Sequence, residues 1–383
     1  MKKALRLHTV LLCALLVLLC ACDRLLPKDD LSVAEHDDPF AYKEETQSSE
    51  PEEETEPPLP SAGNYYAMRS ILQDFVNQGV EHGQFLLEHY DGDVDQDLRR
   101  VVKYLTKEDP VVAYATDYLY CERYPYHEGW LVSVDAIFRR SVSEIQSIIP
   151  VRGNEAAMEK LLDAMTQLQG SMTLRISGYL QEDLSEKLLA YCMEHPETMV
   201  EIPQIAVSVY PDSGNVRVVE VHFTFDQDRE TIRTMRQESN NILDSAYNFI
   251  RYAPTPQEKL SMLNEYLTGR FPYTEDPEAT VYSLLCQGTC DSRSYAAVTR
   301  YLCEKTDIEC QIVSGSRGEL PYWWNMICVD GLYYHVDLQR DNLEQNEVTL
   351  RLDSDMEGYV WDRERYPVCD GVAEPETEPT QTP

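Results

Sequence analysis

The sequence predicts an α+β fold built from two similar modules and a third, different domain, and three observations support this prediction. Amphipathic helical stripes alternate with strands of period-two hydropathy between residues 65 and 249. The same order of helices and strands occurs twice, in residues 65–150 and in residues 151–249. A new helix with a capping box then begins at Thr255, and we place the boundary of the last domain, residues 250–370, just before it.

The two modules begin and end with matching elements. Each opens with an apolar helical stripe, made by Met68, Ile71, Leu72 and Phe75 in the first module and by Met158, Leu161, Leu162 and Met165 in the second. Each closes with strands of alternating hydropathy. The two copies lie about 90 residues apart, which favours an internal duplication. An ordinary α+β chain with this order by chance is the alternative.

The N-terminus has the pattern of a secretory signal. Residues 1–21 carry a basic start, with Lys2, Lys3 and Arg6, and then an apolar run that is short for a spanning helix. The run ends in Leu-Cys-Ala-Cys, which resembles a bacterial lipobox and makes Cys22 the expected site of lipid attachment. The alternative is an ordinary cleaved signal with an incidental cysteine. We expect a lipid-anchored protein on the extracytoplasmic face of the cell membrane.

Charge and composition describe the flanking segments and exclude some partners. Residues 22–64 are rich in Asp, Glu, Pro and Ser, and residues 371–383 are rich in Pro, Thr and Glu. Both segments are poor in large apolar side chains, which predicts a disordered tether and a disordered tail. The chain has 33 Lys and Arg against 67 Asp and Glu, a formal net charge of −34. Such a surface repels phosphate backbones, so nucleic acid is not an expected partner, and the lipid has to provide the membrane attachment.

The last domain contains a cysteine motif. Residues 281–296 include Gly288, Cys290 and then the start of a helical pattern, and this run resembles the nucleophile motif of the transglutaminase-like superfamily of papain-type thiol enzymes. The resemblance implies a buried helix that starts at Cys290. A helix N-terminus favours a thiolate, and its backbone N–H groups can bind an oxyanion.

A hairpin with the family's second motif follows. The family has a strand that begins His-x-Trp-Asn, a tight turn, and a return strand that ends in Asp; this chain has Tyr322-Trp323-Trp324-Asn325 and ends the return strand with Asp337. Asp330-Gly331 is a two-residue hairpin signal that pairs Val329 with Leu332. The resemblance therefore implies that Tyr322 and Asp337 face Cys290, with Tyr322 in the place of the catalytic histidine.

Tyr322 cannot act as the base that this chemistry requires. An imidazole titrates near neutral pH, whereas a phenol is about 0.1% ionised at pH 7. In the predicted register His335 lies opposite Met326. Met326 is four residues along the strand from Tyr322, so His335 is expected ~13 Å from the position of Tyr322. The site of Cys290, Tyr322 and Asp337 is thus expected to be catalytically degenerate. The domain would then be a binding or scaffolding module at the cell surface, for a protein, a peptide or a peptidoglycan-associated ligand.

The alternative is an active enzyme that uses Cys290 for acyl transfer with a different base, as a protease, an amidase or a crosslinker. No cofactor is expected, because no phosphate loop and no dinucleotide motif occurs. No metal site is expected either: Cys286, Cys290, Cys303 and Cys310 lack the paired spacing of zinc ligands.

Overall fold

The computed structural model describes residues 58–372. The predicted signal peptide, the lipidation site Cys22, most of the tether and most of the tail therefore lie outside the described residues. Within residues 58–372, no helix combines the length and the apolar character that a membrane crossing requires.

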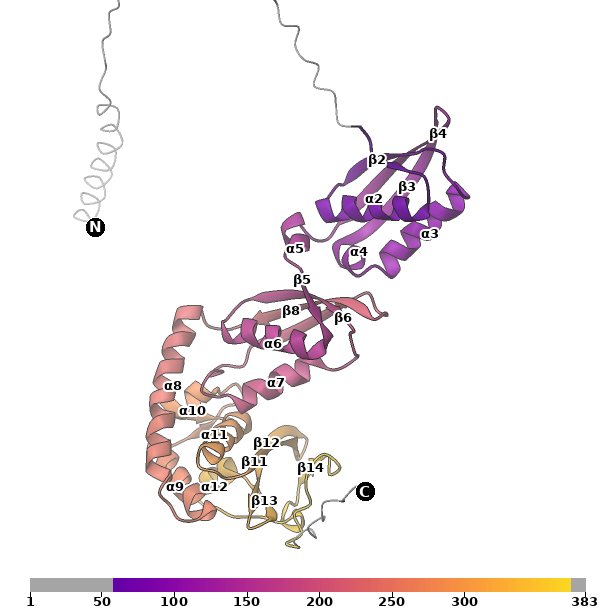
Figure 1. The fold of residues 1–383 in the computed structure, drawn as a ribbon. Helices are drawn as coiled ribbons and strands as arrows, with labels where there is room; N and C mark the ends of the chain where they lie inside the picture. Colours follow the sequence, from indigo (N-terminus) through magenta and orange to yellow (C-terminus); the bar gives the residue numbers. More distant parts are fainter. Residues whose placement is uncertain (1–57, 373–383) are drawn as a thin grey trace, which may run out of the picture. The chain divides into compact units, whose positions relative to one another are not determined.

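The first module is a four-stranded sheet with helices packed along it (Figure 1). Its elements are β1 (Ser61–Ala62), α2 (Tyr65–Gln78), β2 (His82–Leu87), α3 (Val94–Lys107), α4 (Pro110–Ala115), β3 (Thr116–Tyr126) and β4 (Gly129–Phe138). The strand order is β1-β2-β4-β3, with β1 parallel to β2 and the other pairs antiparallel. Helix α2 buries Met68, Leu72 and Val76, which share one face because they are four residues apart.

The second module repeats this architecture. After the short helix α5 (Val142–Gln146) come β5 (Ile149–Arg152), α6 (Gly153–Thr166), β6 (Ser171–Ser177), α7 (Leu184–Glu194), β7 (Gln204–Tyr210) and β8 (Val216–Thr224). The strand order is β5-β6-β8-β7, again with the first pair parallel and the others antiparallel. The two modules thus share strand order and connectivity, apart from the extra helix α4. Their origin by duplication stays a prediction.

The module boundaries differ from the predicted ones at two strands. Strand β1 precedes the predicted start at residue 65, and β5 crosses the predicted division between residues 150 and 151. Both strands are short and pair in parallel with the strand that follows the next helix. Such pairing is long-range, and neither strand has the alternating hydropathy that marks longer strands.

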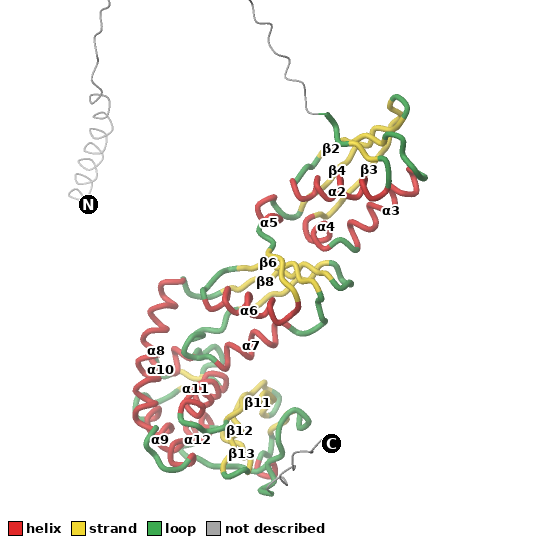
Figure 2. Tube along the Cα trace, in the orientation of Figure 1, coloured by secondary structure: helices red, strands yellow, loops and turns green. Residues whose placement is uncertain are grey.

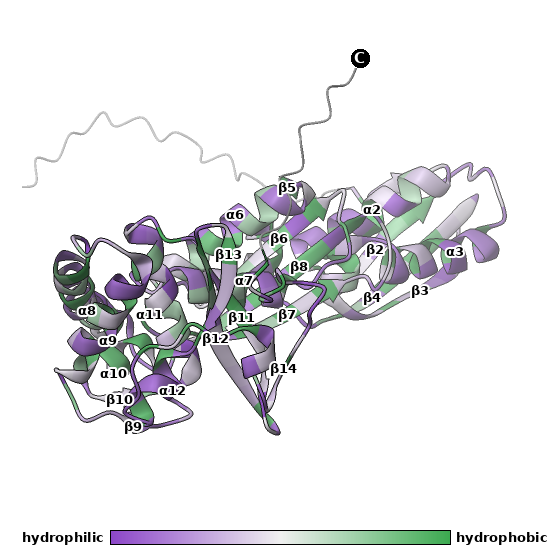
Figure 3. Ribbon diagram, turned by 90° about the horizontal axis from the view of Figure 1, so that it is seen from below, coloured by the Kyte–Doolittle hydropathy of each residue, from purple (hydrophilic) through white to green (hydrophobic). Residues whose placement is uncertain are grey.

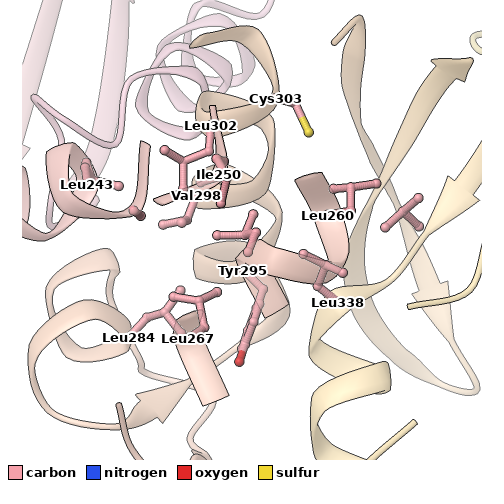
Figure 4. Packing of buried hydrophobic residues seen from close by; sticks show 14 of the residues in the cluster. Leu243, Ile250, Leu260, Leu267, Leu284, Tyr295, Val298, Leu302, Cys303 and Leu338 are labelled. Atoms are coloured by element: carbon pink, nitrogen blue, oxygen red, sulfur yellow. The ribbon is translucent and has the colours of Figure 1, made fainter. Parts of the chain in front are cut away.

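The third boundary, at residue 249/250, is also displaced. Helix α8 (Arg229–Ile250) was assigned to the second module, but its C-terminal half packs in the core of the last domain. Leu243 and Ile250, both labelled in Figure 4, and Ala246 make this contact. Its N-terminal half packs on the second module, where Ile232 contacts a small cluster with Leu168 and Val200. The helix therefore joins the two cores, and no single boundary within it describes the fold.

The last domain combines a helical layer with a four-stranded sheet, the third such sheet in residues 58–372 (Figure 2). Its elements after α8 are α9 (Pro256–Thr268), β9 (Thr274–Glu275), α10 (Val281–Cys286), β10 (Thr289–Cys290), α11 (Ser292–Lys305), β11 (Cys310–Arg317), β12 (Leu320–Val329), β13 (Leu332–Val336), α12 (Leu338–Leu343), the 3-10 turn η2 (Asp353–Asp355) and β14 (Tyr359–Trp361). The sheet has the order β13-β12-β11-β14, with antiparallel neighbours.

The hairpin of β12 and β13 has the predicted register. Val329 pairs with Leu332 and Met326 pairs with His335. The turn residues Asp330 and Gly331 have φ of 51° and 78°. Two consecutive positive φ values are what a tight hairpin turn needs, and an Asp-Gly pair adopts them readily. The mixed α+β fold and this register are therefore confirmed.

Candidate functional site

Cys290 does not open the helix. It is the second residue of β10, which pairs in parallel with β9 and sets Cys290 beside Glu275. The helix α11 begins at Ser292, and its N-cap is Asp291, whose side chain accepts a hydrogen bond from the backbone N–H of Ser294. The helix therefore begins two residues after the predicted start at Cys290. The carboxylate of Asp291 already caps its N-terminus.

The surroundings of Cys290 oppose a thiolate. The side chain is 0% exposed and belongs to the large core cluster of the domain, with Tyr295 and Leu338 nearby in the same cluster. Burial, followed by the negative charges of Glu275 and Asp291, raises the pKa of Cys290 to about 12. Sγ of Cys290 makes no hydrogen bond to any described residue. The favourable effect of a helix end on a thiolate is thus outweighed by desolvation and by two carboxylates.

Asp337 is held by three donors. The Tyr322 hydroxyl donates to its Oδ1 at 3.2 Å, the Arg340 backbone N–H donates to the same oxygen at 2.9 Å, and the Tyr359 hydroxyl donates to Oδ2 at 2.7 Å. Burial nevertheless raises the pKa of Asp337, and burial next to this carboxylate raises the pKa of Tyr322 as well. The predicted neighbours Tyr322 and Asp337 are thus brought together. Tyr359 is a partner that the sequence motifs had not indicated.

Cys290 and the Tyr322–Asp337 pair belong to clusters on opposite faces of the sheet. Tyr322, Trp324 and Met326 pack in a small cluster with Tyr359 and Cys369. The alternate residues of β12, Trp323 and Asn325, face α11. The Asn325 side-chain amide donates a hydrogen bond to the Ala296 carbonyl at 2.9 Å. Trp323 packs against the core cluster that contains Cys290. Because strand side chains alternate, the start of β12 lies against α11 while Tyr322 points to the other cluster.

His335, the histidine of the last domain, forms hydrogen bonds with Trp324 and Asp353. His335 is fully buried, and its Nδ1 accepts a hydrogen bond from the Trp324 indole N–H at 2.9 Å. Since an indole nitrogen can only donate, the proton of the neutral ring is on Nε2, which donates to Asp353 at 2.9 Å. Burial lowers the pKa of His335 and favours this neutral form. Neither ring nitrogen has a free lone pair for a thiol proton.

His335, Asp353 and Cys369 also form a cluster with the residue types of a metal site. One ligand atom of each lies within 4.8 Å of the other two. A metal on Nε2 would move the ring proton to Nδ1, where it would meet the Trp324 N–H, so two donors would face each other. Arg363, whose Nη1 lies 3.5 Å from Asp353, adds a positive charge. The cluster therefore does not fit a metal ion, and it fixes the segment around Cys369 to the sheet instead.

Comparison with known proteins gives little further guidance. No family model matches the chain, and no curated protein matches it. Among solved structures, a candidate cysteine protease from Cytophaga hutchinsonii is similar at 12% identity over 41% of this chain and 70% of its own, with a TM-score of 0.23. A candidate protease from Parabacteroides distasonis is similar at 8% identity over 55% of this chain, with a TM-score of 0.22; the chain spans 46% of that protein.

Proposed function

We propose that this chain is a lipid-anchored extracytoplasmic protein whose last domain is a catalytically degenerate transglutaminase-like domain that serves as a binding or scaffolding module. The single observation that carries the proposal is the state of Cys290. It is completely buried, its pKa is raised to about 12, and no described residue forms a hydrogen bond to its sulphur. A catalytic thiol needs a partner that accepts its proton near neutral pH.

The polar groups around the expected triad support the same conclusion. Asp337 has donors on both oxygens, so it acts as an anchor for Tyr322, Tyr359 and the start of α12. His335 uses both ring nitrogens in hydrogen bonds to Trp324 and Asp353. These bonds support the proposal, because they occupy the groups of Asp337 and His335 in residues 58–372 that could otherwise accept the proton of Cys290.

Alkylation of Cys290 tests directly whether this site is degenerate. The full-length chain is treated with iodoacetamide between pH 5 and pH 9, and the Cys290 peptide is quantified by mass spectrometry, in the native state and in urea. A shift of the thiol pKa from 9.0 to about 12 lowers the thiolate fraction ~1000-fold, so native Cys290 should react at least ~100-fold more slowly than the unfolded chain at pH 7.5. Half-buried Cys328 is the internal reference in the same digest.

Two results together would contradict the proposal. Native Cys290 would show a reactive plateau below neutral pH, and Cys290→Ala would abolish a peptidase or amide-transfer activity. That result would establish the alternative, an acyl-transfer enzyme in which another residue supplies the base for Cys290.

A further inference from the structure

The first module has an unpaired sheet edge. β3 is the outermost strand of its sheet, and in the described part of the chain it pairs only with β4. Its 11 residues make an edge of ~36 Å. Tyr118, Tyr120 and Tyr124 lie exposed on its outer face. Long exposed edges are normally shortened or covered, since they can pair with other chains.

A groove of about 940 Å³ runs between this edge and α3. Its apolar lining includes Val102 from α3, Leu119 from β3 and Trp130 from β4. Four cations and two carboxylates line it, so its net charge is positive in a chain whose formal net charge is −34. The groove therefore has a net positive charge, whereas the chain as a whole has a net negative charge.

Three of these cations are available to a ligand. Arg99, Lys103 and Lys107 are exposed and stand four residues apart along one side of α3, whose hydrophilic colouring is visible in Figure 3. In residues 58–372 none of the three forms an ion pair, whereas Arg123 binds Asp95 through two hydrogen bonds of 2.6 and 2.7 Å.

The corresponding flank of the second module is covered. Val102 of α3 and Leu189 of α7 occupy equivalent places, each directly after a buried residue that faces the sheet, Val101 and Leu188. Leu189 lines a cavity together with residues 277–281 of the last domain, and Arg300 of α11 donates to the Glu194 carbonyl at 2.9 Å. This side of the second module is thus an interface with the last domain, whereas the same side of the first module is exposed.

From these observations we propose that the groove between α3 and β3 binds an extended acidic peptide of a partner protein, which adds to the β3 edge as a further strand. Residues four apart on a helix are ~6 Å apart along its axis, and alternate residues of a strand are ~6.6 Å apart. A peptide with a carboxylate at every second residue therefore matches Arg99, Lys103 and Lys107. Its other side chains lie on the face of Tyr118, Tyr120 and Tyr124. The site does not depend on the state of Cys290.

Fluorescence anisotropy with a labelled peptide tests the proposal. The probe is Glu-Val-Glu-Tyr-Glu-Val-Glu, titrated with the full-length chain in a neutral detergent. The combined variant Arg99→Gln, Lys103→Gln and Lys107→Gln should weaken binding about tenfold or more, and the parent should bind more weakly as salt rises from 50 to 500 mM. N-methylation of alternate residues removes the backbone donors of a strand and should weaken binding by a similar factor.

A matched variant separates the groove from general charge. Arg152→Gln, Lys160→Gln and Arg175→Gln make the same change at exposed, unpaired positions of the second module and should leave the affinity unchanged. Equal binding by the groove variant and the parent would overturn the proposal. So would equal binding of a peptide of the same composition with its four Glu in one block, or of the N-methylated peptide, since strand addition requires both the alternation and the backbone.

Discussion

Replacement of Tyr359 by phenylalanine should reveal how the fold supports the buried carboxylate of Asp337. The Tyr359 hydroxyl is the hydrogen-bond donor to Oδ2, at 2.7 Å, whereas Oδ1 has both the Tyr322 hydroxyl and the Arg340 N–H. Tyr359→Phe keeps the ring in its edge contacts with Tyr322 and Trp324 and removes the hydroxyl, which donates to Oδ2 and also interacts with the Arg340 side chain. Oδ2 is then left in the interior without its partner.

The magnitude follows from the two distances. A hydrogen bond to a charged group contributes about 1.5–3 kcal/mol, and a buried acceptor without a donor bears its full desolvation cost. We expect Tyr359→Phe to lower the free energy of unfolding by about 2–3 kcal/mol. Tyr322→Phe should cost about 1 kcal/mol, because its bond is 3.2 Å long and the Arg340 N–H still serves the same oxygen. The double variant should deviate from additivity, since both changes act on one carboxylate.

The effect should also depend on pH. Burial raises the pKa of Asp337 in the folded state above its value in the unfolded chain, so the folded state binds more protons between the two pKa values. Stability from this group is therefore present at low pH and is lost as pH rises through the folded pKa. Removal of a donor to the ionised form raises that pKa further. The loss caused by Tyr359→Phe should be larger at pH 8 than at pH 4.

Urea denaturation at both pH values, with the m-value checked for constancy, measures these differences. Tyr118→Phe is the matched control, because Tyr118 is exposed and its hydroxyl has no partner in residues 58–372; its effect should stay within about 0.5 kcal/mol. A Tyr359→Phe effect as mild as that of the control, or a larger effect for Tyr322→Phe than for Tyr359→Phe, would contradict the support of Asp337 by the Tyr359 hydroxyl.

Three further predictions concern other parts of the chain. Asp341→Asn should destabilise the last domain by about 3–5 kcal/mol in thermal or urea unfolding, because it leaves buried Arg351 without its carboxylate; a loss below 1 kcal/mol would contradict this. Zinc at tenfold excess should not raise the melting temperature, while His335→Ala should lower it by removing the acceptor of the Trp324 N–H; stabilisation by zinc would show that the cluster binds metal after all. Cys22→Ala should release the chain from the membrane fraction, and mass spectrometry of the parent should find an acylated N-terminal cysteine; a variant that stays in the membrane would refute the lipid anchor.

The sequence by itself determined features that depend on neighbouring residues. Asp330-Gly331 fixed the turn, and with it the register that sets Met326 against His335. Thr255 predicted a helix start and does cap α9. Period-two alternation and helical stripes identified the longer strands and helices of both modules, because burial of one face imposes those periods. The pair of Tyr322 and Asp337 followed from the same hairpin.

Only the tertiary structure decided the features that depend on distant segments. Asp291 rather than Cys290 caps α11, and the carboxylates of Glu275 and Asp291 lie next to a thiol that the core encloses. Tyr359 and Asp353 complete the bonds of Asp337 and His335 from segments more than 15 residues away. The C-terminal half of α8 joins the core of the last domain instead of the module before it. Desolvation, charge and pairing at these positions arise from residues far apart in the chain, and motif spacing carries no information about them.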